Sequence, residues 1–505
     1  MNDVTDGIGG SKRGSRGSGK TSRCRDFALG TLSGVVLSLV AIVTWIGCSG
    51  GGHYVKLALQ PRRWSPDAAA KRQAHHSNIV GAKAHSNAAA AAHAPMLRHN
   101  NTGPTKHSPP PNPAKVHVTL GPRPYFLVSQ LDDDLPLKRA LSQCADTIKT
   151  FKSSDFVLGH RGAALQFPEH THRSHHAAST MGAGLVECDV NLTKDRQLVC
   201  RHMRCDLHTT TDVLLRPELA QTCTVPFQAA KKGGAVANAQ CCTTDFTLEE
   251  IQSLCGKMNG HNPKAKTPQQ YVIGHTPTYQ TDLYSHDCPH IQSHADYIST
   301  VDANGGNFVP EFKMLDYNFS EHEGGGYTRQ MYLDQILNDY DANNIDPSRV
   351  YPQGFVWEDI YYVTQSTVYG DNAFVLDKNM ATVWYTQGQL REYFAPLVEN
   401  GVQTVAPAIF MLLEVDVRGS IVPSTYARVA KEMGLDIIAW TLERSDALSL
   451  GGGWYYSTIA DALTNDSDVL RILDILYEDV GIKAVFCDWA ATATFYANCK
   501  GISLR

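Results

Sequence analysis

The sequence lacks an excess of basic charge. Its 505 residues carry 45 lysines and arginines against 50 aspartates and glutamates, which gives a formal net charge of −5. Because nucleic-acid-binding proteins normally carry a basic patch or stripe, we expect no nucleic-acid partner. The composition is otherwise that of a globular protein, with 43% hydrophobic residues, and it allows a sizeable core.

The cysteines lack the Cys-x2-Cys spacing that is typical of structural zinc sites. Six of the thirteen cysteines fall instead in one Gly-, Lys- and Thr-rich region between residues 205 and 288. Such a cluster in a loop-rich region favours disulfides and an oxidising compartment, ahead of reduced structural cysteines and of zinc. We therefore predict at least two disulfides among Cys205, Cys223, Cys241, Cys242, Cys255 and Cys288.

The N-terminal part differs in character from the rest of the chain. A basic segment, 1–26, precedes 22 uncharged residues, 27–48, which are enough to cross a bilayer core of about 30 Å as a helix. We expect a cytoplasmic tail, a transmembrane signal anchor and a domain outside the cytosol, with the membrane as a partner. A cleaved signal peptide, which would give a secreted protein, and a lipoprotein site at Cys48 remain alternatives. Residues 49–116, rich in Ala, His and Pro, predict a flexible stalk.

Residues 117–505 predict one α/β domain. Helix-like stretches at 327–342, 389–400, 426–433 and 466–477 separate several short apolar runs. Eight strands alternating with helices favour a (β/α)8 TIM barrel, with a doubly wound parallel sheet as the alternative. A cysteine-rich interval at about 203–305 breaks the alternation after the second strand, so we interpret it as an insertion. The predicted strands are 156–159, 185–192, 306–312, 350–355, 373–376, 402–406, 436–441 and 484–488.

Carboxylates lie in the C-terminal parts of two of these strands, near the end of the barrel where barrel enzymes place their active sites. Glu187 and Asp189 are two residues apart, so they point to the same face of their strand, and Glu311 lies on the next strand. Adjacent buried carboxylates repel each other unless a cation or a proton lies between them. Three oxygen ligands without a thiolate suit Mg²⁺ or Ca²⁺ better than zinc.

Histidines and cationic side chains flank this acidic group in the sequence. His160 and His202 suit proton transfer near neutral pH, and Arg161 and Lys313 supply the positive charge that binds a phosphate. Each motif alone has a structural explanation; Glu311 and Lys313, for example, could simply pair. Their joint occurrence at strand ends predicts phosphodiester chemistry.

The motifs resemble those of the glycerophosphodiester phosphodiesterase family. The resemblance rests on Gly-His-Arg-Gly at 159–162, Pro-Glu-x-Thr at 168–171, Glu-x-Asp at 187–189, His202, Glu311-x-Lys313, Ala-Trp-Thr at 439–441 and the final strand ending at Asp488. It implies a barrel with an insertion after the second strand. It also implies site roles: His160 and His202 as the catalytic pair, Glu187, Asp189 and Glu311 as metal ligands, and Arg161, Glu169, Lys313 and Trp440 as substrate-binding residues.

The sequence departs from the family pattern in two motifs. His170 stands where the family usually has Asn, and Gly354 where Ser is common. Three further histidines, His172, His175 and His176, follow the first loop, and we expect them to be exposed on a helix.

The resemblance implies hydrolysis of a glycerophosphodiester to glycerol 3-phosphate and an alcohol. A lysophospholipase D or sphingomyelinase-D-like enzyme acting on a lysophospholipid is an alternative, and so is a non-catalytic surface protein that uses the barrel for binding. For the mechanism we expect one divalent cation, His160 as the base and His202 as the acid. The head group and the oligomeric state do not follow from the sequence.

Overall fold

The computed structural model describes residues 116–505, except 314–316, 318 and 320–325. The predicted cytoplasmic tail, the predicted transmembrane helix at 27–48 and nearly all of the predicted stalk lie outside the described residues.

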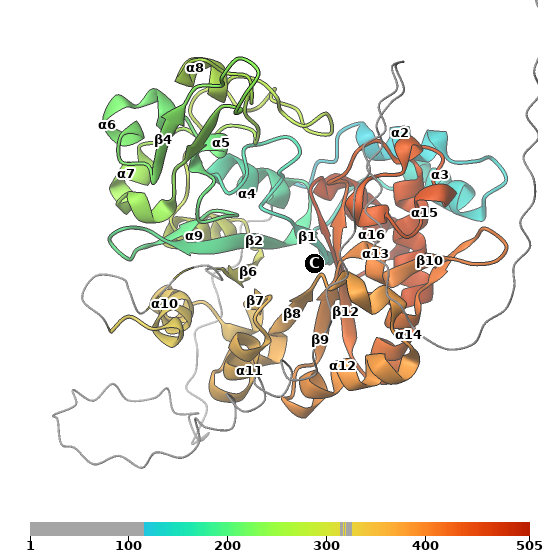
Figure 1. The fold of residues 1–505 in the computed structure, drawn as a ribbon. Coiled ribbons are helices and arrows are strands. Elements are labelled where there is room, and N and C mark those ends of the chain that lie inside the picture. Colours follow the sequence, from blue (N-terminus) through green and yellow to red (C-terminus); the bar gives the residue numbers. More distant parts are fainter. Residues whose placement is uncertain (1–115, 314–316, 318, 320–325) are drawn as a thin grey trace, which may run out of the picture. The chain divides into compact units, whose positions relative to one another are not determined.

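The described chain is built around a closed parallel barrel of eight strands (Figure 1). Each strand is parallel to both neighbours, and pairing of the first strand with both the second and the last closes the sheet. All eight predicted strands are present, so the predicted barrel is confirmed. The strands are β1 (Ser154–Gly159), β2 (Ala183–Leu192), β6 (Asn307–Phe312), β7 (Gln353–Gly354), β8 (Phe374–Asp377), β9 (Thr404–Pro407), β12 (Asp436–Leu442) and β13 (Ala484–Cys487).

Apolar side chains fill the barrel and separate it from the helices around it. Strands buried on both faces need nearly continuous apolar sequence, which explains why their runs could be recognised. An inner cluster includes Leu158, Val309 and Phe486, and a larger cluster lies between the strands and the helices. The outer helices are α4 (His172–Thr180), α9 (His294–Ala303), α10 (Arg329–Ala342), α11 (Trp357–Ser366), α12 (Gln387–Glu399), α14 (Thr425–Glu432), α15 (Asp468–Ile475) and α16 (Ala490–Lys500).

Several smaller elements complete the barrel domain. Two helices, α2 and α3, precede β1 and pack against α16, and a short antiparallel hairpin, β10 and β11, follows β9. Their bounds, with those of the short helices, are α2 (Arg123–Gln130), α3 (Pro136–Thr147), α13 (Ile409–Leu412), β10 (Leu413–Val415), β11 (Ile421–Pro423), η3 (Pro347–Arg349), η4 (Gly370–Asn372), η5 (Met380–Trp384), η6 (Leu448–Leu450), η7 (Trp454–Tyr456), η8 (Ala460–Ala462) and η9 (Leu476–Val480).

The insertion, green in Figure 1, has a hydrophobic cluster of its own. It begins after β3 (Leu198–Cys200), which pairs antiparallel with β2. It ends before α9, which packs on β2 and β6, so residues 294–305 belong to the barrel rather than to the insertion. Its elements are α5 (Leu207–Thr210), η1 (Val213–Leu215), α6 (Pro217–Ala220), β4 (Val225–Gln228), β5 (Asn238–Gln240), η2 (Thr243–Asp245), α7 (Leu248–Gln252) and α8 (Pro268–Val272).

Five disulfides are present in the described residues. Three of them, Cys205–Cys242, Cys223–Cys241 and Cys255–Cys288, lie in the insertion, which confirms the prediction of at least two. Cys188–Cys200 joins β2 to β3, and Cys144–Cys499 joins α3 to α16.

The Cys144–Cys499 disulfide closes a loop of 355 residues, so it should contribute strongly to stability. Replacing both cysteines with serine should lower the free energy of unfolding by about 2–4 kcal/mol, because the unfolded chain gains conformational freedom. Urea denaturation of the oxidised protein measures this. The matched control is the Cys223–Cys241 pair, which closes a loop of only 18 residues; its loss should destabilise less. A larger effect in the control would contradict the loop-length explanation.

Among residues 116–505 with the gaps given above, no helix combines the length and the apolar character needed to span a bilayer. The span predicted at 27–48 lies outside these residues, and the predicted localisation, a single-pass membrane protein with the membrane as partner, is corrected on the basis of the disulfides. The five disulfides are typical of an extracellular or secreted protein.

One prediction about the histidines of α4 is also wrong. His172 and His176 are exposed as expected, but His175 is fully buried. The helix packs against α9 and β2, and the imidazole of His175 faces that contact, where its Nδ1 lies 2.5 Å from Oε1 of Gln292.

Candidate active site

The loop between β1 and α4 has a conformation that its sequence dictates. Gly162 has φ of +86°, and a Cβ there would lie 2.6 Å from the carbonyl carbon of Ser174, so only glycine fits. The Ser174 hydroxyl donates to the carbonyl of Arg161 at 3.0 Å and accepts from the amide of Ala163 at 2.9 Å. Thr171 caps α4 by accepting from the amide of Ser174. These bonds hold the loop that carries His160 and Arg161.

Barrel register brings the three predicted metal-binding carboxylates together. Asp189 on β2 lies opposite Glu311 on β6, and Glu311 lies opposite Gln353 on β7. Glu187, Asp189 and Glu311 are 2%, 1% and 6% exposed, and each places a carboxylate oxygen within 4.8 Å of the others. Burial and the neighbouring carboxylates raise the pKa of Glu187 well above its usual value, and burial raises that of Glu311 to about 8.

Hydrogen bonds orient these carboxylates. Glu187 accepts from the Arg161 amide at 2.8 Å and from Nε2 of Gln353 at 2.7 Å. Glu311 pairs with Nζ of Lys313 at 2.9 Å. Asp189 Oδ1, in contrast, is buried without a hydrogen-bond partner. An unsatisfied buried oxygen beside two more carboxylates fits a hard divalent cation, because such ions take oxygen ligands.

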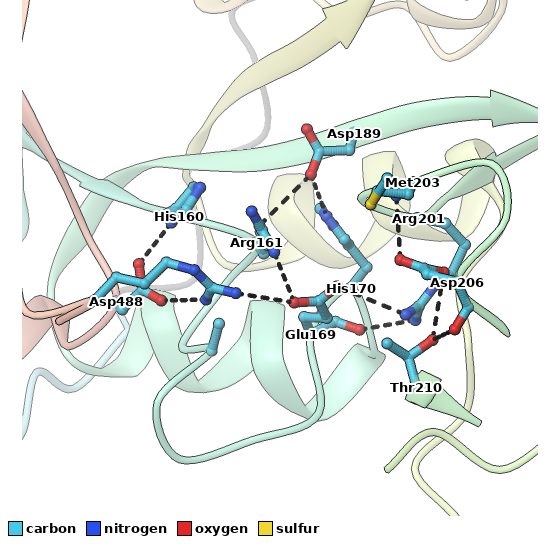
Figure 2. Close-up of polar contacts among 12 residues, drawn as sticks. His160, Arg161, Glu169, His170, Asp189, Arg201, Met203, Asp206, Thr210 and Asp488 are labelled. Atoms are coloured by element: carbon cyan, nitrogen blue, oxygen red, sulfur yellow. Dashed lines mark hydrogen bonds and ion pairs between the residues drawn. The ribbon is translucent and has the colours of Figure 1, made fainter. Parts of the chain in front are cut away.

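His160 is held by a carboxylate from the last strand of the barrel. Its Nδ1 lies 2.5 Å from Oδ1 of Asp488, which directly follows β13 (Figure 2). Its Nε2 faces Oε2 of Glu187 at 3.9 Å. Although burial alone would raise it, the charges of His160 and Arg444 lower the pKa of Asp488 to about 2, so this carboxylate is ionised. Burial lowers the pKa of His160, and the charge of Asp488 opposes this effect.

His202 lies on the loop after β3 and is half-buried. One of its ring nitrogens is within 4.8 Å of carboxylate oxygens of Glu169 and Asp206. Burial and the positive charges of Arg161, Lys313 and Arg444 depress its pKa well below the usual value. The positive charges of Arg161 and Lys313, which lie beside the three carboxylates, therefore also act on His202.

Arg161 and Glu169 form a buried ion pair beside these groups (Figure 2). Nη1 of Arg161 lies 2.9 Å from Oε2 of Glu169, and its Nε lies 3.9 Å from Oδ2 of Asp189. Two more guanidinium groups approach Glu169, those of Arg201 at 3.7 Å and Arg444 at 3.8 Å. Burial raises the pKa of Glu169, but these three charges outweigh it and hold the pKa far below normal.

Trp440 lies on β12 and is half-buried in a cluster of aromatic rings. Its indole N–H donates to the carbonyl of Ala406 at 2.8 Å. Its ring centroid is 5.9 Å from that of Phe355, 5.7 Å from Trp454 and 5.8 Å from Tyr455. The predicted substrate-binding residue thus belongs to an aromatic wall of four side chains.

His170 takes part in the site. Its Nε2 lies 2.7 Å from Oδ2 of Asp189, and the side chain is fully buried (Figure 2). The imidazole therefore orients one of the three carboxylates from a position where the family usually has asparagine.

Sequence reasoning gave no role to four residues that complete the arrangement: Asp488, Arg444, Gln353 and His170. The sequence did contain a signal for Asp488, because this carboxylate is at the end of the last predicted strand. Arg444 had none, because its partner Asp488 is 44 residues away; its Nη1 donates to Oδ2 of Asp488 at 2.7 Å.

The raised pKa of Glu311 predicts how the metal-free protein responds to pH. Between pH values of about 4.5 and 8 the folded protein holds a proton on Glu311 that the unfolded chain has lost. Stability should therefore fall as pH rises through this range, by up to about 1.4 kcal/mol per pH unit for one such group. Urea unfolding in EDTA at several pH values measures the slope. Glu311→Gln should have a shallower slope, and equal slopes would contradict this role of Glu311.

Comparison with known proteins gives a match over most of the described chain. The model of the glycerophosphoryl diester phosphodiesterase family matches residues 160–489. A protein of Arthroderma benhamiae named "Extracellular protein" is 38% identical over 246 residues, which are 48% of this chain and 99% of that protein. A probable glycerophosphodiester phosphodiesterase of Mycobacterium tuberculosis is 35% identical over 123 residues, which are 23% of this chain and 44% of that protein. The chain thus spans less than half the length of the mycobacterial relative.

A solved structure, that of a putative glycerophosphoryl diester phosphodiesterase from Silicibacter pomeroyi, overlaps the chain with a TM-score of 0.44 and 16% identity. The overlap covers 70% of this chain and 95% of that one. The family match begins directly after β1 and runs past the end of β13, and it includes the two histidines and the three carboxylates described above. The chain belongs to the glycerophosphoryl diester phosphodiesterase family, a family of phosphoric diester hydrolases.

Proposed function

We propose that this protein hydrolyses glycerophosphodiesters to glycerol 3-phosphate and an alcohol, using one divalent cation and two histidines. The observation that carries the proposal is the convergence of three buried carboxylates with His160 at the carboxyl ends of neighbouring strands. In barrel enzymes this end of the strands holds the active site.

Glu187, Asp189 and Glu311 would hold the cation, Mg²⁺ or Ca²⁺. Such an ion supplies Lewis-acid stabilisation of charge on phosphate oxygens and lowers the pKa of a bound hydroxyl. Gln353 and His170 keep two of the ligands in place through their hydrogen bonds to Glu187 and Asp189. Lys313 and Arg161 add positive charge beside the carboxylates, where a phosphate would be attracted.

The two histidines have different surroundings, which favour different roles. Surroundings that separate the pKa values of two titratable groups decide which group acts as the acid and which as the base. Burial lowers the pKa of His160, but Asp488 opposes this effect through Nδ1 and leaves Nε2 to deliver a proton. The cations around His202 favour its neutral form. We assign His202 as the base that removes the proton of the attacking hydroxyl, and His160 as the acid that protonates the departing alcohol oxygen. This reverses the preference from the sequence.

Loss of one cation ligand should abolish most of the activity. Glu187→Gln should reduce kcat/KM on glycerophosphocholine by at least about 10²–10³-fold. Loss of this ligand would weaken binding of the cation that stabilises negative charge in the transition state. The wild type should lose activity in EDTA and regain it with Mg²⁺ or Ca²⁺. The matched control is Glu392→Gln, an exposed glutamate of α12, which should change neither rate nor metal response.

Two results would contradict these assignments. Wild-type turnover by Glu187→Gln would show that Glu187 does not hold a required cation. Absence of turnover on every glycerophosphodiester with either cation would contradict the proposed reaction itself.

A further inference from the structure

Arg123, at the start of α2, contacts both segments that carry the support of His160. Its Nε lies 2.8 Å from Oε1 of Glu443, and its guanidinium lies over the Trp489 ring, 4.6 Å from the ring centroid. Glu443 directly precedes Arg444 in the sequence, and Trp489 directly follows Asp488. One side chain therefore holds the neighbours of both members of the Arg444–Asp488 ion pair.

The Arg444–Asp488 ion pair orients the carboxylate that binds His160. Nη1 of Arg444 donates to Oδ2 of Asp488 at 2.7 Å, and Oδ1 of the same carboxylate lies 2.5 Å from Nδ1 of His160. With both oxygens held, the plane of the carboxylate is fixed, and so is the direction from which it contacts the imidazole. A shift of Arg444 or of Asp488 would therefore change the orientation of the ring.

Glu443 has a backbone conformation that its surroundings must maintain. Its φ is +66°, in the left-handed region that residues with a side chain rarely adopt, and such a conformation persists only where neighbouring groups hold it. The hydroxyl of Thr492 donates to Oε1 of Glu443 at 3.0 Å, and the Glu443 amide donates to the Tyr456 hydroxyl at 3.4 Å. The contact with Arg123 adds opposite charges at a residue that is 7% exposed, which makes it the strongest of the three. The direction in which the chain continues to Arg444 thus depends on Arg123.

Arg123 is itself held by a part of the chain that precedes the barrel. Its helix, α2, packs against α3 and α16, and Leu127 of this helix is fully buried. The Cys144–Cys499 disulfide joins α3 to α16. Arg123 also precedes the residues that match the family model, 160–489, so this support of the site comes from outside the family match.

Close packing is not what fixes the contacts of Arg123. Arg123, Glu443 and Trp489 all line a cavity of about 300 Å³, and the side chain of Arg123 is 25% exposed. Part of the surface of these side chains is therefore not covered by other side chains. In such a place the ion pair and the cation–aromatic contact hold the two segments together.

We propose that Arg123 is a positioning residue for His160. It holds the residues next to Arg444 and Asp488 in place. Asp488 in turn orients the imidazole through Nδ1, so that Nε2 can deliver a proton. The inference rests on the proposed function, in which His160 protonates the departing alcohol, and Arg123 acts through Asp488 rather than on the substrate.

Arg123→Met tests the proposal, because methionine keeps an unbranched side chain but removes the charge. We expect kcat on glycerophosphocholine to fall by about ten- to a hundredfold with little change in KM, since a small misplacement of a catalytic group has an effect of this size. The rate on an aryl diester should fall much less, because its leaving group needs little protonation. Steady-state kinetics on both diesters measures the ratio of the two rates.

Arg349→Met is the matched control. Arg349 also pairs with an acid, Asp302, at 2.6 Å, it lies over the aromatic ring of Phe308, and its side chain is 23% exposed. Its loss should lower stability but leave the ratio of the two rates as in the wild type. An unchanged ratio in Arg123→Met, or the same change of ratio in both variants, would overturn the proposal.

A second variant keeps the test decisive if Arg123→Met does not fold. Glu443→Gln removes the charge that Arg123 binds and keeps the size of the side chain. The same selective loss on the alkyl diester is expected, and a wild-type ratio in this variant would equally overturn the proposal.

A measurement independent of turnover separates this inference from the proposed function. If the full-length protein turns over no glycerophosphodiester, the proposed function has failed. The hydrogen bond between His160 and Asp488 is then observed by proton NMR, as a strongly downfield resonance that His160→Ala removes. Loss of this resonance in Arg123→Met with its retention in Arg349→Met supports the positioning role. Its absence from the wild type, or an unchanged resonance in Arg123→Met, refutes it.

Discussion

Replacing His160 with alanine should reduce kcat/KM by about 10²–10⁴-fold on a diester of an alkyl alcohol such as choline, and much less on an aryl diester. An alkoxide is a poor leaving group that needs a proton as it departs, whereas an aryloxide departs without one. Asp488 favours the protonated form of His160, which suits it to supply that proton. Steady-state kinetics on both substrates measures the difference.

His202→Ala provides the matched comparison. A base acts on the attacking hydroxyl, so its loss should reduce the rate on both diesters by similar factors. Equal losses for both variants on both substrates would remove the assignment of roles while leaving both histidines in the mechanism. A greater sensitivity of His202→Ala to the leaving group would reverse the assignment.

Asp488→Asn should have an effect comparable to loss of His160 itself. An asparagine keeps the size of the side chain, but it no longer stabilises the imidazolium or selects the tautomer with the proton on Nδ1. A change of this kind in a carboxylate–histidine pair lowers kcat by up to about 10⁴-fold. We expect kcat to fall on the alkyl diester with little change in KM. A rescue of the rate on an aryl diester would separate this effect from misfolding.

Asp377→Asn is the control for Asp488→Asn. Asp377 is also a buried aspartate at the end of a barrel strand, but its carboxylate accepts from the hydroxyls of Tyr426 and Tyr393. Its replacement should lower stability without a selective loss on the alkyl diester. If both variants lose the same activity with the same substrate pattern, Asp488 acts through the fold rather than through His160.

Much of the barrel could be predicted because the relevant signals are local in sequence. A strand buried on both faces requires a short apolar run, and the runs that end at Gly159 and Phe312 are such segments. The pair Glu187 and Asp189 could be placed on one face from the twofold alternation of a strand alone. Their proximity to Glu311 could be predicted because consecutive strands of a barrel are neighbours. In the structure β2 pairs with β6, and the register places Asp189 opposite Glu311.

The buried position of His175 could not be predicted from its neighbours. Its neighbours His172 and His176 are exposed, and most residues of α4 are polar. The helix face that turns inward is decided by its packing against α9, which follows the long insertion. The end of the insertion could not be predicted for the same reason, because only the contacts of α9 with β2 and β6 show that this helix belongs to the barrel.

The sequence by itself determined the barrel class, the disulfide-rich insertion and the group of chemically active residues near strand ends. These features depend on apolar periodicity and on short spacings that any folded chain with this pattern must respect. The tertiary structure alone decided which groups face each other: Asp488 lies against His160 across 328 residues, and Gln353 against Glu187 across 166. It also brought Arg123, Tyr279, Glu443 and Trp489, which come from different parts of the chain, around one cavity. Closure of the barrel places the last strand beside the first, and the charges that set the behaviour of each histidine arrive from strands and loops that are distant in the chain.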